Sequence, residues 1–159
     1  MKVYVVRHAW AVDRSVCRTD AERPLTEDGR KRFAKFVRKL VKRGLSIDRI
    51  ATSPLVRCRE TAEILAEGLP RRPEIELLDA LRPESDLESI DRWIAEHQNC
   101  KSTALVGHAP DVCTIVERMI GGGAVWFPKG AVARVSFDLT IGFGHGELDW
   151  LVTPKLLNC

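Results

Sequence analysis

The sequence predicts an α/β protein built as a three-layer sandwich, with a mostly parallel sheet, helices on both faces and a C-terminal antiparallel hairpin. Three observations predict this fold. Short apolar runs typical of buried strands alternate with amphipathic helical segments along most of the chain. The final part instead contains two strand-like runs around a glycine-rich turn. The length of 159 residues, with 45% hydrophobic and 30% charged residues, fits a single domain over residues 1–159.

The first predicted strand is Val3–Val6, a β-branched and aromatic run. Thr26 is placed to cap the N-terminus of the first helix, which we expect to stop at Gly44. The apolar positions of this helix recur at i, i+3, i+4, i+7 and i+8, as one buried stripe requires. They are Phe33, Phe36, Val37, Leu40 and Val41.

A second strand is predicted over Ile47–Ala51, and a second helix follows it directly. We expect Ser53 to be the N-cap of this helix and Pro54 to occupy its first helical position. The helix ends near Gly68. After a proline-containing loop, a third strand is predicted at Ile75–Leu78.

The rest of the chain supplies two more helices and three strands. Apolar spacing predicts helices over Leu87–His97 and Val112–Met119, with a buried strand at Thr103–Val106 between them. Val132–Leu139 and Glu147–Val152 then form the two arms of the expected hairpin.

Composition and charge exclude several classes of protein. The 25 basic and 22 acidic residues leave a net charge of +3, too small to indicate a nucleic-acid-binding protein. No apolar stretch reaches the roughly 20 residues of a membrane span, and none resembles a signal peptide. The five cysteines are scattered without a CxxC pair, which favours reduced thiols over disulfides or a zinc site. We expect a cytoplasmic monomer with no metal, cofactor, membrane or nucleic-acid partner.

Two arginines and two histidines follow the predicted strands from three distant parts of the sequence. They are Arg7, His8, Arg57 and His108. Because open α/β sheets bind ligands at the carboxyl ends of their strands, we expect these side chains to meet at one edge. Guanidinium groups match phosphate bidentately and stay charged at any relevant pH. The pattern therefore predicts a pocket for phosphate or another oxyanion, in which a histidine can serve as nucleophile without a metal.

Further short motifs accompany these residues. Arg7-His8-Ala9 ends the first strand, and the others are Pro24-Leu25-Thr26 with Gly29, Ser53-Pro54 with Arg57 and Glu60-Thr61, and Gly107-His108. In order and spacing they resemble the histidine phosphatase superfamily, with its phosphoglycerate-mutase-like fold, over nearly the whole chain. The small size is similar to that of SixA-type phosphohistidine phosphatases. The resemblance implies that His8 is the phosphorylated nucleophile and that Arg7, Arg57 and His108 form the phosphate pocket.

The sequence departs from the family pattern at two points. Ala9 stands where the family usually has glycine, and no acidic residue matches the family's proton donor with certainty. The candidates are Glu84 and Asp86, although Asp86 can equally be the N-cap of the following helix. A pocket without a clearly positioned proton donor suits a phosphohistidine better than an alkyl ester, because the leaving nitrogen of a phosphohistidine is more easily protonated than an alkoxide.

The resulting expectation is a metal-independent phosphatase with a phosphohistidine enzyme intermediate, acting on phosphohistidine of a signalling or phosphotransfer protein. Two alternatives stay open: a phosphatase of a small phosphorylated metabolite, and a phosphate-binding module without turnover. The stretch Arg30 to Arg43 carries eight basic residues and no acid. It is interpreted as a solvated helix face, with an electrostatic dock for an acidic partner as the alternative.

Overall fold

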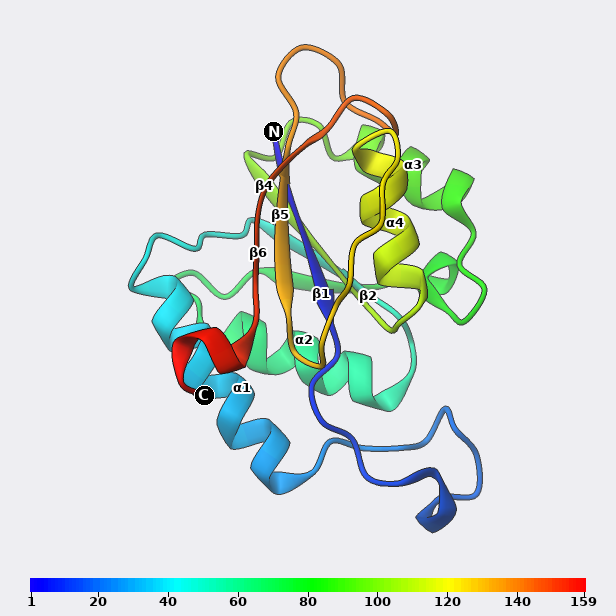
Figure 1. Cartoon of the computed structure of the whole chain (residues 1–159), viewed down its shortest axis with the longest axis vertical. Coiled ribbons are helices and arrows are strands. Elements are labelled where there is room, and N and C mark those ends of the chain that lie inside the picture. Colours follow the sequence, from blue (N-terminus) through cyan, green and yellow to red (C-terminus); the bar gives the residue numbers. More distant parts are fainter.

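The computed structural model describes residues 1–159, and a six-stranded sheet runs through its centre (Figure 1). The strands are β1 (Lys2–Arg7), β2 (Arg49–Thr52), β3 (Glu74–Leu77), β4 (Ser102–Gly107), β5 (Val132–Ser136) and β6 (Glu147–Val152). Their order across the sheet is β3-β2-β4-β1-β5-β6. The first four strands pair in parallel, whereas β5 and β6 pair antiparallel. The predicted mixed sheet and its C-terminal antiparallel pair are therefore confirmed.

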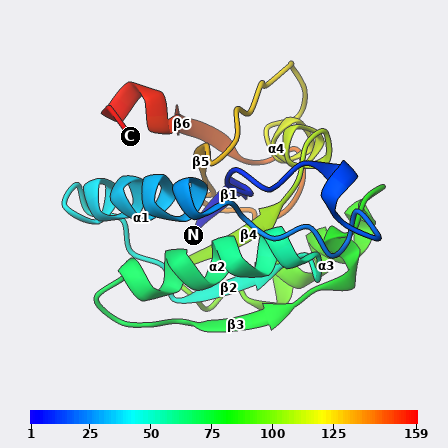
Figure 2. The ribbon, with the colours of Figure 1, turned by 90° about the horizontal axis from the view of Figure 1, so that it is seen from below.

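Helices cover both faces of the sheet, as the sequence predicts. They are α1 (Glu27–Val41), α2 (Val56–Gly68), α3 (Leu87–Glu96) and α4 (Asp111–Met119). One apolar cluster joins α1 and α2 to the sheet, and a second cluster joins α3 and α4 to it. Figures 1 and 2 show the two helix pairs apart, with the sheet between them. None of the helices combines the length and apolarity needed to cross a membrane.

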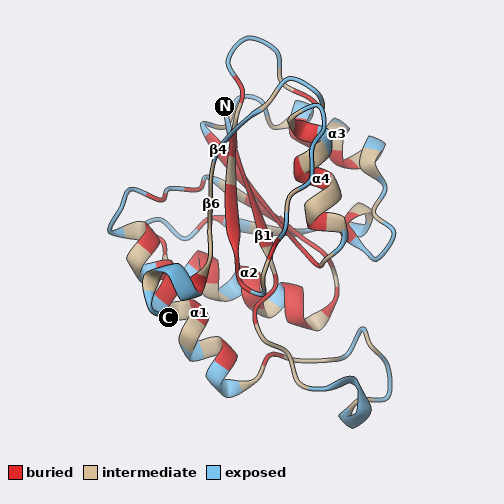
Figure 3. Cartoon of the chain, viewed as in Figure 1, coloured by how far each residue is buried: buried red, intermediate tan, exposed pale blue.

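The central strands are apolar on both sides because both of their faces are covered. Successive side chains of a strand point to opposite faces. Tyr4 and Val6 accordingly belong to the cluster under α1 and α2, while Val3 and Val5 belong to the cluster under α3 and α4. Figure 3 shows this burial concentrated in the sheet and on the helix faces turned toward it. The resulting rigid centre fixes where the strand ends lie.

Helix α1 follows from its sequence almost residue by residue. The Thr26 hydroxyl accepts a hydrogen bond from the Gly29 amide at 2.9 Å, so the predicted N-cap is confirmed. Gly29 also packs tightly, because a Cβ there would lie 2.5 Å from the Trp10 carbonyl oxygen. The helix ends at Val41, shortly before Gly44 with its φ of 91°. The close packing of Gly29 against Trp10 explains why a glycine accompanies the Pro24-Leu25-Thr26 motif.

The prediction that Ser53 caps α2 is wrong. The helix begins at Val56, its N-cap is Leu55, and no side chain caps it. The Ser53 amide still donates to the Val106 carbonyl of β4 at 2.9 Å, so Ser53 continues the strand ladder. The chain can therefore turn into the helix only after Pro54.

The basic face of α1 is partly used within the protein. Three of its cations donate to backbone carbonyls of the last residues: Arg32 to Cys159, Lys35 to Asn158 and Lys39 to Leu157. These carbonyls lie at the C-terminal end of the short 3-10 helix η3 (Pro154–Leu157), where cations are favoured. Part of the predicted charged face therefore anchors the C-terminal segment.

We expect Lys39→Ala to loosen that segment. Its ammonium lies 2.5 Å from the Leu157 carbonyl oxygen, and losing one such hydrogen bond costs about 0.5–1.5 kcal/mol. Hydrogen exchange of the amides in residues 154–159 should accelerate, and urea unfolding should show the matching loss. Lys42→Ala is the control, because Lys42 is exposed and makes no side-chain hydrogen bond. Equal exchange in both variants would contradict the anchoring role.

Candidate active site

The residues predicted to bind an oxyanion lie past the carboxyl ends of neighbouring parallel strands. Arg7 ends β1 and pairs with Gly107 at the end of β4, so His8 and His108 follow two adjacent strands. The His8 amide extends the pairing by donating to the Gly107 carbonyl at 2.9 Å. Arg57 comes from the first turn of α2, which follows β2 on the other side of β4. The sheet topology therefore brings the four side chains to one edge.

His8 is buried and neutral, with one ring nitrogen fixed by the backbone. Its Nδ1 lies 2.7 Å from the Ala9 carbonyl oxygen, which can only accept, so the proton sits on Nδ1. Its Nε2 then carries the lone pair and accepts from Arg57 Nε at 3.2 Å. Burial is the main cause that lowers the pKa of His8 to about 3. The hydrogen bond to the Ala9 carbonyl raises this pKa, whereas the charges of Arg57, Arg7 and His108 lower it further. The group has the form of a nucleophile at neutral pH.

Arg57 is held by a residue that the sequence does not single out. Its Nη1 donates to the Asp20 carbonyl oxygen at 2.7 Å, and its Nη2 to an Asp20 carboxylate oxygen at 2.8 Å. Asp20 also pairs with Arg23 at 2.8 Å. The hydrogen bonds from Arg23 and Arg57 lower the pKa of Asp20 despite partial burial. The ionised carboxylate holds a guanidinium that is only 4% exposed.

Arg7 is fixed from the loop between α4 and β5. Its Nη1 donates to the Phe127 carbonyl oxygen at 2.5 Å, whereas its buried Nε has no partner. Burial lowers the pKa of Arg7 from its ordinary value. The side chain remains a cation beside His8, as an oxyanion pocket requires.

The Glu60-Thr61 motif ties the site to the surrounding fold. The Thr61 hydroxyl donates to the Arg57 carbonyl at 2.6 Å and accepts from the Ala9 amide at 3.1 Å. Glu60 accepts from the Leu25 amide at 2.6 Å and forms an ion pair with Arg30. These contacts connect the segment after His8, the start of α1 and helix α2, so the motif has a positioning role.

His108 makes a contact that the sequence analysis missed. Its Nε2 lies 2.5 Å from Oδ2 of Asp111 in the first turn of α4. The two atoms are in ionic contact without hydrogen-bond alignment, and His108 Nδ1 has no partner at all. Burial lowers the pKa of His108, whereas Asp111 raises it and Arg57 lowers it further. The spacing His108-x-x-Asp111 was the available signal, since residues three apart face each other at a helix start.

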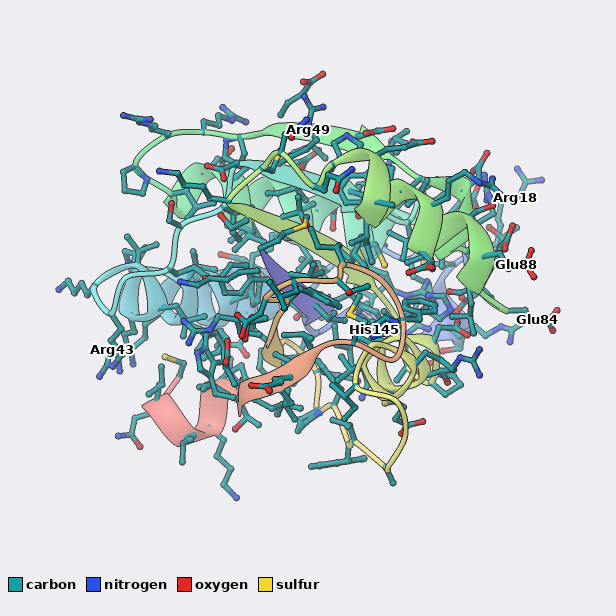
Figure 4. All side chains as sticks on the ribbon, turned by 90° about the horizontal axis from the view of Figure 1, so that it is seen from above. Arg18, Arg43, Arg49, Glu84, Glu88 and His145 are labelled. Carbon is teal, nitrogen blue, oxygen red and sulfur yellow. The ribbon has the colours of Figure 1, made fainter.

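The two carboxylates proposed from the sequence as proton donors lie outside this group. Asp86 is the N-cap of α3, accepting from the Ser89 amide at 3.1 Å, and these bonds lower its pKa. Glu84 is exposed, and Figure 4 shows it at the rim of the molecule, directed outward. Neither side chain makes a hydrogen bond or ion pair with His8 or His108, so the structure offers neither as the donor.

The site's side chains match an oxyanion better than a cation. Arg7 and Arg57 contribute two guanidinium groups beside the neutral ring of His8. No group of three or more histidine, cysteine, aspartate or glutamate side chains is arranged to hold a metal ion. The arrangement can bind a phosphoryl group and present a ring nitrogen to it.

We expect Thr61→Val to lower the free energy of unfolding by about 1–3 kcal/mol, because it leaves the buried Ala9 amide without an acceptor. The matched control is Thr103→Val, since the Thr103 hydroxyl is buried without a hydrogen-bond partner. That change should be neutral or stabilising in urea denaturation. A Thr61→Val variant as stable as the control would contradict the assigned role.

Acid should destabilise the fold partly through His8. Its folded pKa of about 3 lies below the ordinary value of 6.5, so the unfolded state binds more protons between these values. Stability is therefore lost as the pH falls from about 6.5 toward 3. We expect His8→Asn to flatten this loss in urea denaturation series at fixed pH. An unchanged slope would mean that burial does not keep His8 neutral.

Comparison with known proteins identifies relatives of this fold and site. The family model for the histidine phosphatase superfamily (branch 1) matches residues 3–90. An uncharacterized protein of Picosynechococcus is 36% identical over 114 residues, 70% of this chain and 68% of that protein. The phosphohistidine phosphatase SixA of Escherichia coli is 26% identical over 157 residues, 97% of this chain and 94% of that protein.

Solved structures agree with these relatives. The protein histidine phosphatase SixA complexed with tungstate superposes with a TM-score of 0.88 and 26% identity, covering 99% of both chains. The α-ribazole phosphatase of Shigella flexneri shares the fold, with a TM-score of 0.74 and 16% identity over 97% of both chains. With its phosphoglycerate-mutase-like sheet and its motifs in family order, the chain resembles SixA, and it belongs to the histidine phosphatase superfamily as a phosphatase.

Proposed function

We propose that the protein is a phosphohistidine phosphatase in which His8 attacks phosphorus and becomes phosphorylated. The observation that carries the proposal is the state of the His8 ring: its Nδ1 is tied to the Ala9 carbonyl, and its Nε2 is unprotonated beside Arg57. A ring fixed in this way presents one nitrogen as nucleophile. The relatives named as phosphohistidine phosphatases, one of them solved with the oxyanion tungstate, support the same reading.

The first step transfers the phosphoryl group to His8. The Nε2 lone pair forms a bond to phosphorus while the bond from phosphorus to the substrate nitrogen breaks. Arg57 Nε donates to Nε2 in the free protein, so this N–H must turn to a phosphoryl oxygen when substrate arrives. Arg7 and Arg57 then hold the oxygens over which negative charge spreads in a loose transition state.

The second step releases phosphate and restores the enzyme. A water oxygen bonds to phosphorus, and the electron pair of the His8–phosphorus bond returns to Nε2. The two arginines stay charged throughout, so they can bind both the phosphorylated enzyme and the phosphate product. Since they neutralise the phosphoryl oxygens, the reaction we propose needs no metal ion.

The substrate we propose is a phosphohistidine of a signalling or phosphotransfer protein. Glu84 and Asp86 are both exposed, and Asp86 is engaged in capping α3. Neither of these two carboxylates contacts His8 or His108, so neither is placed to protonate a strongly basic alkoxide leaving group. An imidazole nitrogen is a leaving group that is easier to protonate, so the site favours a P–N bond over an alkyl ester.

The test compares wild type with His8→Ala on a phosphohistidine-containing phosphotransfer domain and on p-nitrophenyl phosphate, each with and without EDTA. We expect release of phosphate from the protein that resists EDTA, falls by at least about 10³-fold in His8→Ala and proceeds through phosphorylated His8. The matched control is His145→Ala, since His145 lies exposed in the loop before β6 (Figure 4).

Three other outcomes would contradict the proposal. Turnover of p-nitrophenyl phosphate alone would point to a phosphatase of small metabolites. Tight phosphate binding with no turnover and no phosphorylated His8 would leave a phosphate-binding module. An unchanged rate in His8→Ala would remove His8 as the nucleophile.

A further inference from the structure

We propose that His108 and Asp111 together supply the proton for the leaving group, with His108 as the donor and Asp111 as its positioning residue. The inference deepens the function proposed above and rests on it. It answers a question that the sequence leaves open, since neither Glu84 nor Asp86 contacts His8 or His108. The ionisable groups that do contact the site residues are therefore the remaining candidates.

The first observation is a buried ionic contact. His108 Nε2 lies 2.5 Å from Asp111 Oδ2, and the two side chains are 8% and 16% exposed. A carboxylate beside a buried imidazole stabilises the protonated ring and fixes its orientation. Asp111 can do this because it lies three residues after His108, where the chain enters α4.

The second observation is the other ring nitrogen. Both ring nitrogens of His108 lack an aligned hydrogen bond, but Nε2 is in ionic contact with Asp111, whereas the buried Nδ1 has no partner of any kind. With Nε2 turned to Asp111, Nδ1 is the nitrogen left to act on a bound group. A histidine held by a carboxylate at one nitrogen and free to exchange a proton at the other is the arrangement of a general acid–base.

Three charged side chains and one neutral ring surround His108. In the free protein, burial disfavours the imidazolium most strongly and lowers the pKa of His108. Asp111 of α4 and Asp20 of the loop before α1 favour the imidazolium, whereas Arg57 of α2 disfavours it. The neutral ring of His8, after β1, is the fourth neighbour. A phosphoryl group adds negative charge among these groups, and negative charge favours the protonated ring. We expect His108 to be an imidazolium when an oxyanion is bound.

The proton then cycles through His108. In the first step, His8 Nε2 bonds to phosphorus, the bond from phosphorus to the substrate imidazole breaks, and the Nδ1 proton of His108 passes to the departing nitrogen. In the second step, water bonds to phosphorus, the His8–phosphorus bond breaks, and a water proton passes to His108 Nδ1. His108 is again an imidazolium beside Asp111, and no other proton source is required.

The role of His108 and Asp111 can be tested with substrates whose leaving groups differ in how much they need a proton. Wild type, Asp111→Asn and Asp111→Leu are compared on phenyl phosphate, whose phenolate needs a proton, and on p-nitrophenyl phosphate, whose phenolate hardly does. We expect kcat/KM for phenyl phosphate to fall about 10²–10⁴-fold in both variants, and kcat/KM for p-nitrophenyl phosphate to fall less than about tenfold. Glu88→Gln is the matched control, because Glu88 lies in the first turn of α3, exposed and directed outward (Figure 4).

Equal losses on the two esters would overturn the inference, since a purely structural Asp111 would damage both reactions alike. A second measurement reports the protonation state of His108 directly, in the wild-type protein and without turnover. Nitrogen-15 NMR of wild type with tungstate should show His108 as an imidazolium at pH 7, and a neutral ring would overturn the inference.

A failure of the proposed phosphatase function can be distinguished from a failure of this inference by whether phosphorylated His8 forms. If wild type incubated with either ester or with phosphoramidate yields no phosphorylated His8, the proposed function fails and this inference fails with it. If phosphorylated His8 forms but the two esters respond equally to Asp111→Asn, only the inference fails.

Discussion

The parallel pairing of β1 with β4 is the constraint on which the site depends. The register that sets Arg7 opposite Gly107 places His8 and His108 side by side, from positions far apart in the chain. A slip of β1 by one residue would exchange the side chains on its two faces, so that the large Tyr4 would leave the cluster under α1 and α2 for the space that Val3 and Val5 fill on the other face. The two hydrophobic clusters therefore enforce the register, and the register assembles the histidines.

Assembling the site buries the polar side chains of His8, His108 and Arg57. The hydrogen bonds around them follow from the need to give these buried groups partners. His8 and His108 are each 6% exposed and Arg57 is 4% exposed. Burying a polar group without a partner is costly, so most such groups are hydrogen-bonded. Asp20 meets this need for Arg57, and the Ala9 carbonyl meets it for His8. These bonds also select the chemical state of each group: a charged guanidinium and a neutral ring whose Nε2 is unprotonated.

The sequence indicates the strands, the helices and the four strand-end residues because each depends on local pattern. Apolar periodicity marks the buried elements, and topology alone then brings the strand ends to one edge. Other features depend on how loops fold back. Nothing near Asp20 in the sequence shows that it reaches Arg57, and the partners of Lys35 and Lys39 lie 123 and 118 residues away. The start of α2 was misplaced because Ser53 satisfies both a cap and a strand pattern, and its bond to β4 decides between them. Asp111 was accessible from spacing but has no motif to mark it.

We infer that the backbone selects which nitrogen of His8 reacts. Phosphorus-31 NMR of the phosphorylated protein, prepared with phosphoramidate and quenched in base, separates the two ring isomers. Because Nδ1 is held by the Ala9 carbonyl at 2.7 Å, we expect a single signal from phosphate on Nε2 of His8. Phosphate on Nδ1, or no phosphorylated histidine at all, would contradict this inference.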